Sequence, residues 1–260
     1  MSLAQCQRLI RVPKRAAWLL LCGCLLLTGC GGGKNSKLAA ADAAADSPAN
    51  LYIGLATAYY ERGQMPAALE NAERAVQADN KNANAHYMLA VIHQRLGQTK
   101  EAEHAFAAAL RIAPDNPDIL NAHGSMLCLA GKYREAAAQF DKALKNPLYQ
   151  TPEVALMNAA KCAERAKQGT EAERHLRNAL TANPNFAPAL YSMAELSFKR
   201  GAYPESYEYM VRYFRVGQVT PESLLLMSRV LSGLGKPKEA KAAADALRKR
   251  FPDSPQVMQL

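Results

Sequence analysis

The side chains whose chemistry is easiest to place in this sequence are the thiols of its cysteines. A thiol can be acylated, can pair in a disulfide or can bind a metal ion, and the outcome depends on the compartment and on its neighbours. The 260 residues include six cysteines, namely Cys6, Cys22, Cys24, Cys30, Cys128 and Cys162. Four of them lie in the first 30 residues, so that segment decides the compartment in which the other two are found.

The first 29 residues are typical of a secretory signal peptide. Arg8, Arg11, Lys14 and Arg15 supply positive charge without any acid, and an apolar segment follows at 16–27. This segment is too short to span a bilayer as a stable helix, and small residues follow it as they do before a cleavage site. We therefore expect export and an oxidising compartment.

Leu27-Thr28-Gly29-Cys30 resembles the lipobox of bacterial lipoproteins. In such proteins the signal is removed and the new N-terminal cysteine is lipidated, so Cys30 is the expected lipidation site. The alternative is a plain signal peptide with a chance cysteine. Gly31 rather than aspartate follows Cys30, and by resemblance to Gram-negative lipoproteins this favours the periplasmic face of the outer membrane.

Residues 30–48 have no apolar periodicity and begin with Gly31-Gly32-Gly33 after the cysteine. A flexible tether of this length has an r.m.s. span of roughly 20–25 Å. Without the signal, the formal charge falls from +9 to +5, and the excess is not gathered in one basic tract. This argues against a nucleic-acid partner and favours, at most, a weak attraction to anionic headgroups or to an acidic protein.

No catalytic or metal-binding motif is recognisable. The segment Gly31–Asn35 lacks the serine or threonine and the first glycine of a phosphate loop, and no strand precedes it. His86, His93 and His123 fall at packing positions of the repeat described next, so we expect core histidines rather than a metal site. We therefore expect no cofactor, no metal and no enzymatic activity.

A repeat of 34 residues organises the rest of the chain. Its clearest column consists of small residues that recur 34 apart, with one two-residue slip, at Ala68, Ala102, Ala136, Ala172, Ser206 and Ala240. The period resembles that of the tetratricopeptide (TPR) repeat, a helix–turn–helix unit. We therefore predict an all-α TPR superhelix (α-solenoid) at 49–260, with six repeats at 49–82, 83–116, 117–150, 153–186, 187–220 and 221–254.

Other columns of the repeat have a physical explanation. A glycine and then a proline should end the first and second helix of most repeats. Small residues at the eighth position should let the two helices approach, at Ala56, Ala90, Gly124, Ala160 and Ala194. Large residues should fill the space between them, at Leu55, Tyr59, Leu89, Phe106, Leu127 and Phe140. Repeat four departs from the pattern, because Thr151-Pro152 is inserted before it and its glycine, Gly169, is late.

The two remaining cysteines can form a disulfide. Cys128 and Cys162 lie at positions 12 and 10 of the first helices of repeats three and four, about 160° apart on a helical wheel. First helices of neighbouring repeats lie side by side, so the two thiols can face the same gap. The alternative is a pair of buried free thiols.

The concave side of such a superhelix is lined by positions 2, 5, 9 and 12 of the first helices. In repeats one and two these positions carry Ile53, Tyr60, Tyr87 and Val91, which we predict to be a partner-binding groove. Further residues on the same side are Thr57, Asn121, Ser125, Met157, Tyr191, Phe198, Leu225 and Arg229. The alternative is that these side chains only touch one another across a tight superhelix.

In detail the chain resembles the type IV pilus biogenesis and stability lipoproteins, the TPR pilotins of the PilF/PilW type. The resemblance rests on the lipobox, the six repeats and three specific segments at 146–149, 222–226 and 248–255. It implies a non-catalytic role in assembling the outer-membrane secretin through which the pilus leaves the cell. Two other classes remain open at this point, a lipoprotein adaptor for β-barrel assembly or cell-wall enzymes and an unrecognised periplasmic enzyme.

Overall fold

The computed structural model describes residues 47–260, so the signal peptide, Cys30 and most of the tether lie outside the described residues. The described part is all-helical, as the TPR pattern predicted, and contains twelve α-helices and one short 3-10 helix. They are α3 Pro48–Glu61, α4 Met65–Ala78, α5 Ala83–Arg95, α6 Thr99–Ile112, α7 Pro117–Leu129, α8 Tyr133–Leu144, α9 Pro152–Arg165, α10 Gly169–Ala182, α11 Ala187–Lys199, α12 Tyr203–Val216, α13 Pro221–Gly233, α14 Pro237–Arg250 and η1 Pro255–Gln259.

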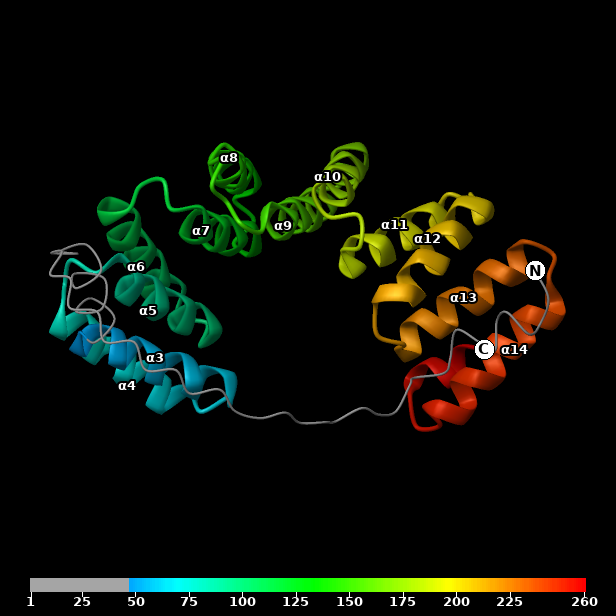
Figure 1. Ribbon diagram of the computed structural model, residues 1–260, viewed down its shortest axis with the longest axis horizontal. Coiled ribbons are helices and arrows are strands. Elements are labelled where there is room, and N and C mark those ends of the chain that lie inside the picture. Colours follow the sequence, from blue (N-terminus) through cyan, green and yellow to red (C-terminus); the bar gives the residue numbers. More distant parts are fainter. Residues whose placement is uncertain (1–46) are drawn as a thin grey trace, which may run out of the picture.

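The helices pair in sequence order, and each pair is one repeat. The six pairs follow one another around an open arc, with the blue N-terminal repeat and the red C-terminal segment at its two ends (Figure 1). The second helices α8 and α10 project from the outer side of the arc above α7 and α9 (Figure 1). Within residues 47–260, no helix has the length and apolar character needed to cross a membrane.

Three residues connect the two helices of every repeat. The middle one is in the left-handed region, which glycine adopts at no steric cost, with φ between 68° and 77° at Gly63, Gly97, Gly131, Gly201 and Gly235. In repeat four the equivalent residue is Lys167, with φ of 59°. The interpretation of Gly169 as a late helix-ending glycine is therefore wrong, because Gly169 is the first residue of α10.

Polar caps and prolines fix where the first helices begin. The side chains of Ser47, Asn82, Asn116 and Thr220 each accept a backbone N–H from the first turn of the helix that follows. Proline stands in the first or second position of five of the six first helices, where its missing N–H removes no helical hydrogen bond.

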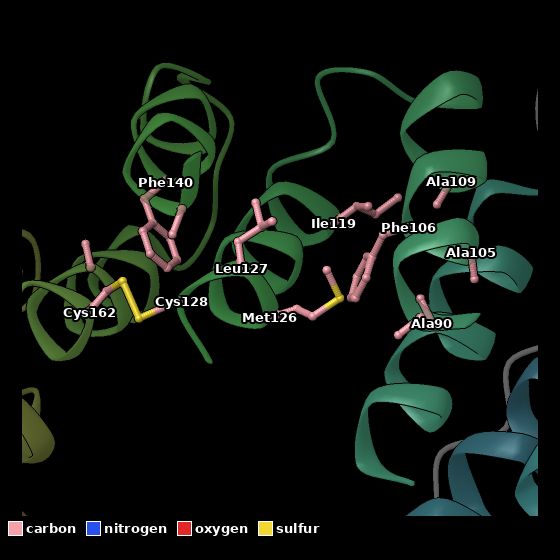
Figure 2. Close-up of a cluster of buried hydrophobic side chains, with 13 residues drawn as sticks. Ala90, Ala105, Phe106, Ala109, Ile119, Met126, Leu127, Cys128, Phe140 and Cys162 are labelled. Carbon is pink, nitrogen blue, oxygen red and sulfur yellow. A yellow bond between two sulfur atoms is a disulfide. The ribbon is translucent and has the colours of Figure 1, made fainter. Parts of the chain in front are cut away.

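The small residues at the eighth position are all buried, as predicted. The tightest case is Gly124, where a Cβ atom would lie 2.9 Å from Cε1 of Phe140. Phe106 extends from α6 toward Ile119 and Met126 of α7, so it links repeat two to repeat three (Figure 2).

The expectation for Leu55 is wrong, because this side chain is 38% exposed. The equivalent residues of later repeats pack against the preceding repeat, and none of the described helices precedes α3. Tyr59 and Leu89 are half-buried, whereas Phe106, Leu127 and Phe140 are buried as expected.

The connection between repeats three and four is irregular. Four residues join the other repeats, but seven residues, 145–151, lie between α8 and α9. Asn146 Nδ2 donates to the carbonyl of Asp115 at 3.2 Å, which holds this linker against the preceding turn. Within the linker Leu148 is 77% exposed, whereas Tyr149 is only 8% exposed.

Candidate partner-binding groove

The four residues of the predicted groove are half-buried and lie on neighbouring first helices, α3 and α5. Tyr60 packs beside the buried Ala56 and Met88. Tyr87 and Val91 pack on a second cluster, where the Tyr87 ring lies 6.3 Å from the Phe106 ring. These side chains therefore contribute to packing between repeats and also leave part of their surface exposed.

Ile53 differs from the other three, because it belongs to none of the apolar clusters found among residues 47–260. The Thr57 hydroxyl, one turn later on the same face, donates to the Ile53 carbonyl at 2.9 Å. The Ile53 side chain is half-buried outside these clusters and is therefore available to a partner.

Tyr87 is also part of a polar cluster that the sequence did not reveal. Burial raises the pKa of Tyr87, and the nearby Asp118 carboxylate raises it further, followed by Tyr149 and Tyr60. Burial likewise raises the pKa of Tyr149, with Asp118 and Glu153 acting in the same direction. The Asp118 carboxylate thus acts on two tyrosines, one from the second repeat and one from the irregular linker.

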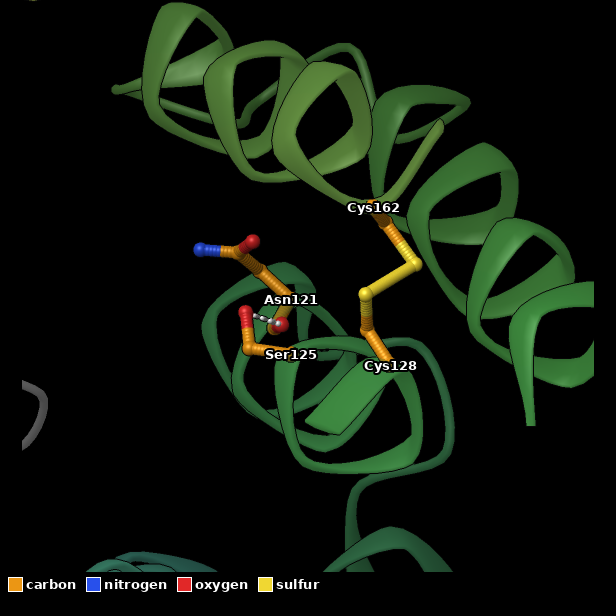
Figure 3. The surroundings of a disulfide bond; sticks show 4 residues. All are labelled: Asn121, Ser125, Cys128 and Cys162. Atoms are coloured by element: carbon orange, nitrogen blue, oxygen red, sulfur yellow. Dashed lines mark hydrogen bonds between the residues drawn. A yellow bond between two sulfur atoms is a disulfide. The ribbon is translucent and has the colours of Figure 1, made fainter. Parts of the chain in front are cut away.

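The centre of the concave side is polar. Asn158 Nδ2 of α9 donates to Asn121 Oδ1 of α7 at 3.0 Å. The Ser125 hydroxyl donates to the Asn121 carbonyl at 3.0 Å (Figure 3). The two amides connect the first helices of repeats three and four across the irregular joint. Both amides are half-buried, and their remaining donors and acceptors can hydrogen-bond to the backbone of a bound chain.

The C-terminal half carries a second aromatic and acidic cluster. Burial raises the pKa of Tyr191, and the Glu195 and Glu222 carboxylates raise it further. The Tyr191 ring lies 5.5 Å from the ring of Tyr213, whose hydroxyl donates to a backbone carbonyl of the turn after α12. Phe198, also on the concave side, is half-buried beside Tyr203 at a ring distance of 5.7 Å.

Leu225 and Arg229 are less available for binding than their positions suggested. Leu225 is 6% exposed and packs with Leu224, Leu247 and other residues of the last repeat. Arg229 donates to Gln259 of η1, which lies against α13. The 3-10 helix η1 therefore covers part of α13, the first helix of repeat six.

Cys128 and Cys162 are joined in the structure, with their Cα atoms 5.6 Å apart (Figure 3). Both residues are buried, and they connect α7 to α9 beside Phe140 (Figure 2). Asn121 and Ser125 extend from a different side of α7 than Cys128 does (Figure 3). Formation of this bond in the purified protein stays a prediction.

The expectation of core histidines is wrong for His86 and His93, which are half-buried at helix ends. Nε2 of His86 lies 3.0 Å from the Asn80 carbonyl, and Nδ1 of His93 lies 2.6 Å from Gln98 Oε1. His123 is half-buried against Phe106, at a ring distance of 5.4 Å. Among residues 47–260, no group of three or more histidine, cysteine or acidic residues is arranged to hold a metal ion.

The histidine that is buried, His175, was missed by the sequence analysis. It lines a hollow of about 550 Å³ on the outer side of the arc between α8 and α10. Ala159 and Ala163 of α9 form part of its floor, where repeat three carries the larger His123 and Leu127. The hollow could not be predicted from the repeat pattern, because alanine is common at many positions of the repeat and two further alanines do not stand out.

Three models of the tetratricopeptide repeat match the chain, at residues 59–125, 130–185 and 222–254. The type IV pilus assembly protein PilF of Pseudomonas aeruginosa is 26% identical over 228 residues, which cover 88% of this chain and 90% of that protein.

Two solved structures cover most of the described residues. The crystal structure of PilW, a widely conserved type IV pilus biogenesis factor, has a TM-score of 0.72 and 31% identity, and it covers 81% of this chain and 97% of its own. The structure of Pseudomonas aeruginosa PilF has a TM-score of 0.73 and 25% identity, and it covers 82% of this chain and 96% of its own. On this evidence the chain belongs to the PilF/PilW family of TPR proteins in type IV pilus biogenesis.

Proposed function

We propose that this protein is a lipoprotein anchored to the outer membrane through Cys30 and that it assists assembly or localisation of the type IV pilus secretin. The membership in the PilF/PilW family supports a role in pilus biogenesis. The lipobox at 27–30 supports the anchor. A solenoid without a recognisable catalytic site supports a scaffold rather than an enzyme.

The observation that carries the proposal is the half-buried apolar and aromatic surface of α3 and α5. Tyr60 and Tyr87 lie on the adjacent first helices α3 and α5, and both side chains are half-buried. A helix or strand of a secretin subunit can place its apolar side between them and against Ile53 and Val91. Aromatic anchors of this kind supply much of the binding energy at protein interfaces.

A binding measurement with a double variant tests this proposal. If the two tyrosines together contribute at least about 2 kcal/mol, Tyr60→Ala with Tyr87→Ala should weaken binding of a purified secretin subunit at least about 30-fold. Tyr59→Ala is a matched control, because Tyr59 packs in the same cluster as Tyr60 but occupies a different position of the repeat. The control should lose stability and keep its affinity.

The result can contradict the proposal in two ways. Unchanged secretin binding by a folded double variant would move the site away from repeats one and two. Capture of barrel-assembly or cell-wall proteins by the wild-type chain, with no binding to the purified secretin, would replace the secretin role with that of a different adaptor.

A further inference from the structure

Two tyrosine–carboxylate pairs occur at the same positions of different repeats. Tyr87 is the fifth residue of repeat two, and Asp118 is the second residue of repeat three. Tyr191 and Glu222 stand in the same relation at repeats five and six. The other three junctions of successive repeats combine Ile53 with Asn84, Asn121 with Val154 and Met157 with Pro188.

The first pair is reinforced by the inserted linker. Tyr149 is 8% exposed, and its hydroxyl is buried without a hydrogen-bond partner in the described chain. Thr151 and Asn121 lie close to this hydroxyl without meeting hydrogen-bond geometry. Asp118 stands on the concave side of the next first helix, is exposed, raises the pKa of both Tyr87 and Tyr149, and forms no ion pair with a basic side chain of residues 47–260.

The second pair has a similar environment. Glu222 is exposed, and its Oε1 accepts a hydrogen bond from Gln256 Nε2 at 2.9 Å, which leaves the other oxygen available. Glu195, one turn after Tyr191, adds a second carboxylate to this group. Within the described part of the chain, neither glutamate forms an ion pair.

Helix stability alone explains part of this arrangement, since an acid in the first turn of a helix interacts favourably with its dipole. Asp118 and Glu222 both occupy such positions. The dipole does not require a tyrosine on the adjacent first helix. A carboxylate beside an aromatic ring is suited to a lysine or arginine, which gains an ion pair and a cation–π contact.

The charge of the concave side agrees with a basic ligand. At positions 2, 5, 9 and 12 of the six first helices there are four acids, namely Asp118, Glu164, Glu195 and Glu222, against the two bases Lys161 and Arg229. Residues 47–260 as a whole have an excess of bases over acids. The concave side is therefore more acidic than the rest of the described surface.

We propose that Tyr87 with Asp118 and Tyr191 with Glu222 form two subsites that bind two lysine or arginine side chains of one extended protein segment. The inference rests on the proposed function, because it assigns the chemistry of the segment that the concave groove takes. Taking roughly 10 Å between packed first helices, three repeats separate the subsites by about 30 Å. An extended chain covers that distance in about nine residues.

Synthetic peptides test this inference without the secretin. The probe is a glycine-serine peptide with blocked ends and two arginines nine residues apart, titrated into the 47–260 chain and followed by NMR of the tyrosine rings and backbone amides. Residues 47–260 contain all the described packing, and solved relatives of nearly the same extent are folded. Signals of Tyr87 and Tyr191 should move together.

Removing either the basic side chain of the peptide or the carboxylate of the protein should weaken binding to the same extent. Replacement of one arginine by alanine should weaken binding about five- to tenfold, and so should Asp118→Asn or Glu222→Gln. Glu101→Gln is the matched control, because it removes an exposed first-turn carboxylate from α6, a second helix. It should leave the affinity unchanged and should cost a similar amount of stability.

Equal affinities of the two-arginine and arginine-free peptides would overturn the inference. An equal loss of affinity in Glu101→Gln would also overturn it, because binding would then depend only on net charge. A secretin subunit that binds Asp118→Asn and Glu222→Gln as tightly as the wild type would refute the subsites and leave the proposed function standing. If the secretin does not bind the wild type, the peptides still decide the inference.

Discussion

Lys167 is the only residue other than glycine with a positive φ in the part of the chain that the structure describes. Left-handed backbone costs an L-residue roughly 1–2 kcal/mol, although glycine also gives the unfolded chain more freedom. Lys167→Gly should therefore raise the free energy of unfolding by up to about 1 kcal/mol, measured by urea denaturation. Lys167→Ala is the control. A similar gain in the free energy of unfolding there would show that loss of the lysine side chain, and not the freedom of the glycine backbone, causes the effect.

His175 should make stability depend on pH. Burial lowers the pKa of this imidazole, and Arg174 lowers it further. The folded state then binds a proton less readily than the unfolded state, whose histidine pKa is about 6.5, so stability should fall as the pH drops below that value. Burial lowers the pKa of His123 in the same direction.

The measurement compares urea unfolding at pH 7 and pH 5. His175→Gln introduces the residue that repeat three carries at the same position, Gln139, and should reduce the loss of stability on acidification. Adding His123→Leu should reduce it further. A double variant with the same pH dependence as the wild type would show that other groups are responsible.

At the scale of helices and linkers, the disulfide crosses the irregular joint. It closes a loop with a sequence separation of 34, for which restriction of the unfolded chain contributes about 4 kcal/mol, less any strain. Reduction, or Cys128→Ala with Cys162→Ala, should lower the free energy of unfolding by up to that amount. A reductant should not affect the double variant.

Thiol titration decides whether this bond forms. The purified 47–260 chain, denatured without a reductant, should show no reactive thiol. Two reactive thiols per chain would mean that Cys128 and Cys162 are free, and the expected effect of a reductant would then disappear.

The helices were predictable because glycine, alanine and proline recur in one register, and each has a local physical role. Features that break the register were not predictable. Lys167 adopts a conformation that its residue type does not favour, and Tyr149 belongs to a linker with no equivalent in other repeats. Leu55 is exposed because it lies in the first described repeat, an end effect that residue periodicity does not express.

The candidate groove was predictable in position but not in chemistry. The repeat identifies which residues lie on the concave side, including Tyr87 and Tyr191. It does not reveal that Asp118 and Glu222 act on these tyrosines, because the two members of each pair belong to different repeats and an acid in the first turn is common in any helix. The polar cluster became visible only with the packing of neighbouring first helices.

At the scale of the whole molecule, the anchor is the main prediction. Cys30 lies outside the described residues, so the expectation rests on the lipobox. Two or more acyl chains hold a protein stably on a bilayer, whereas one binds only marginally. Cys30→Ser should yield an uncleaved precursor or a soluble periplasmic product, and secretin multimers should decrease or remain at the inner membrane.

Membrane flotation and immunoblotting of secretin multimers are the measurements for this variant. A Cys30→Ser protein that still floats with outer membranes and supports normal secretin assembly would refute the anchor. The Tyr60 and Tyr87 double variant is a useful comparison, because it should reach the outer membrane normally and fail at a later step.

The seven-residue linker at 145–151 also has a mechanical consequence. A solenoid bends by small rotations between neighbouring repeats, and each half of this arc has three repeats joined by four-residue connections. The longest connection restrains its neighbouring helices least, so the angle between the two halves at this joint depends on side-chain packing and on the Cys128–Cys162 bond that joins α7 to α9 in the structure. Reduction should soften the arc at this point alone, so that each half keeps its curvature while the span between Tyr87 and Tyr191 fluctuates more widely (Figure 1).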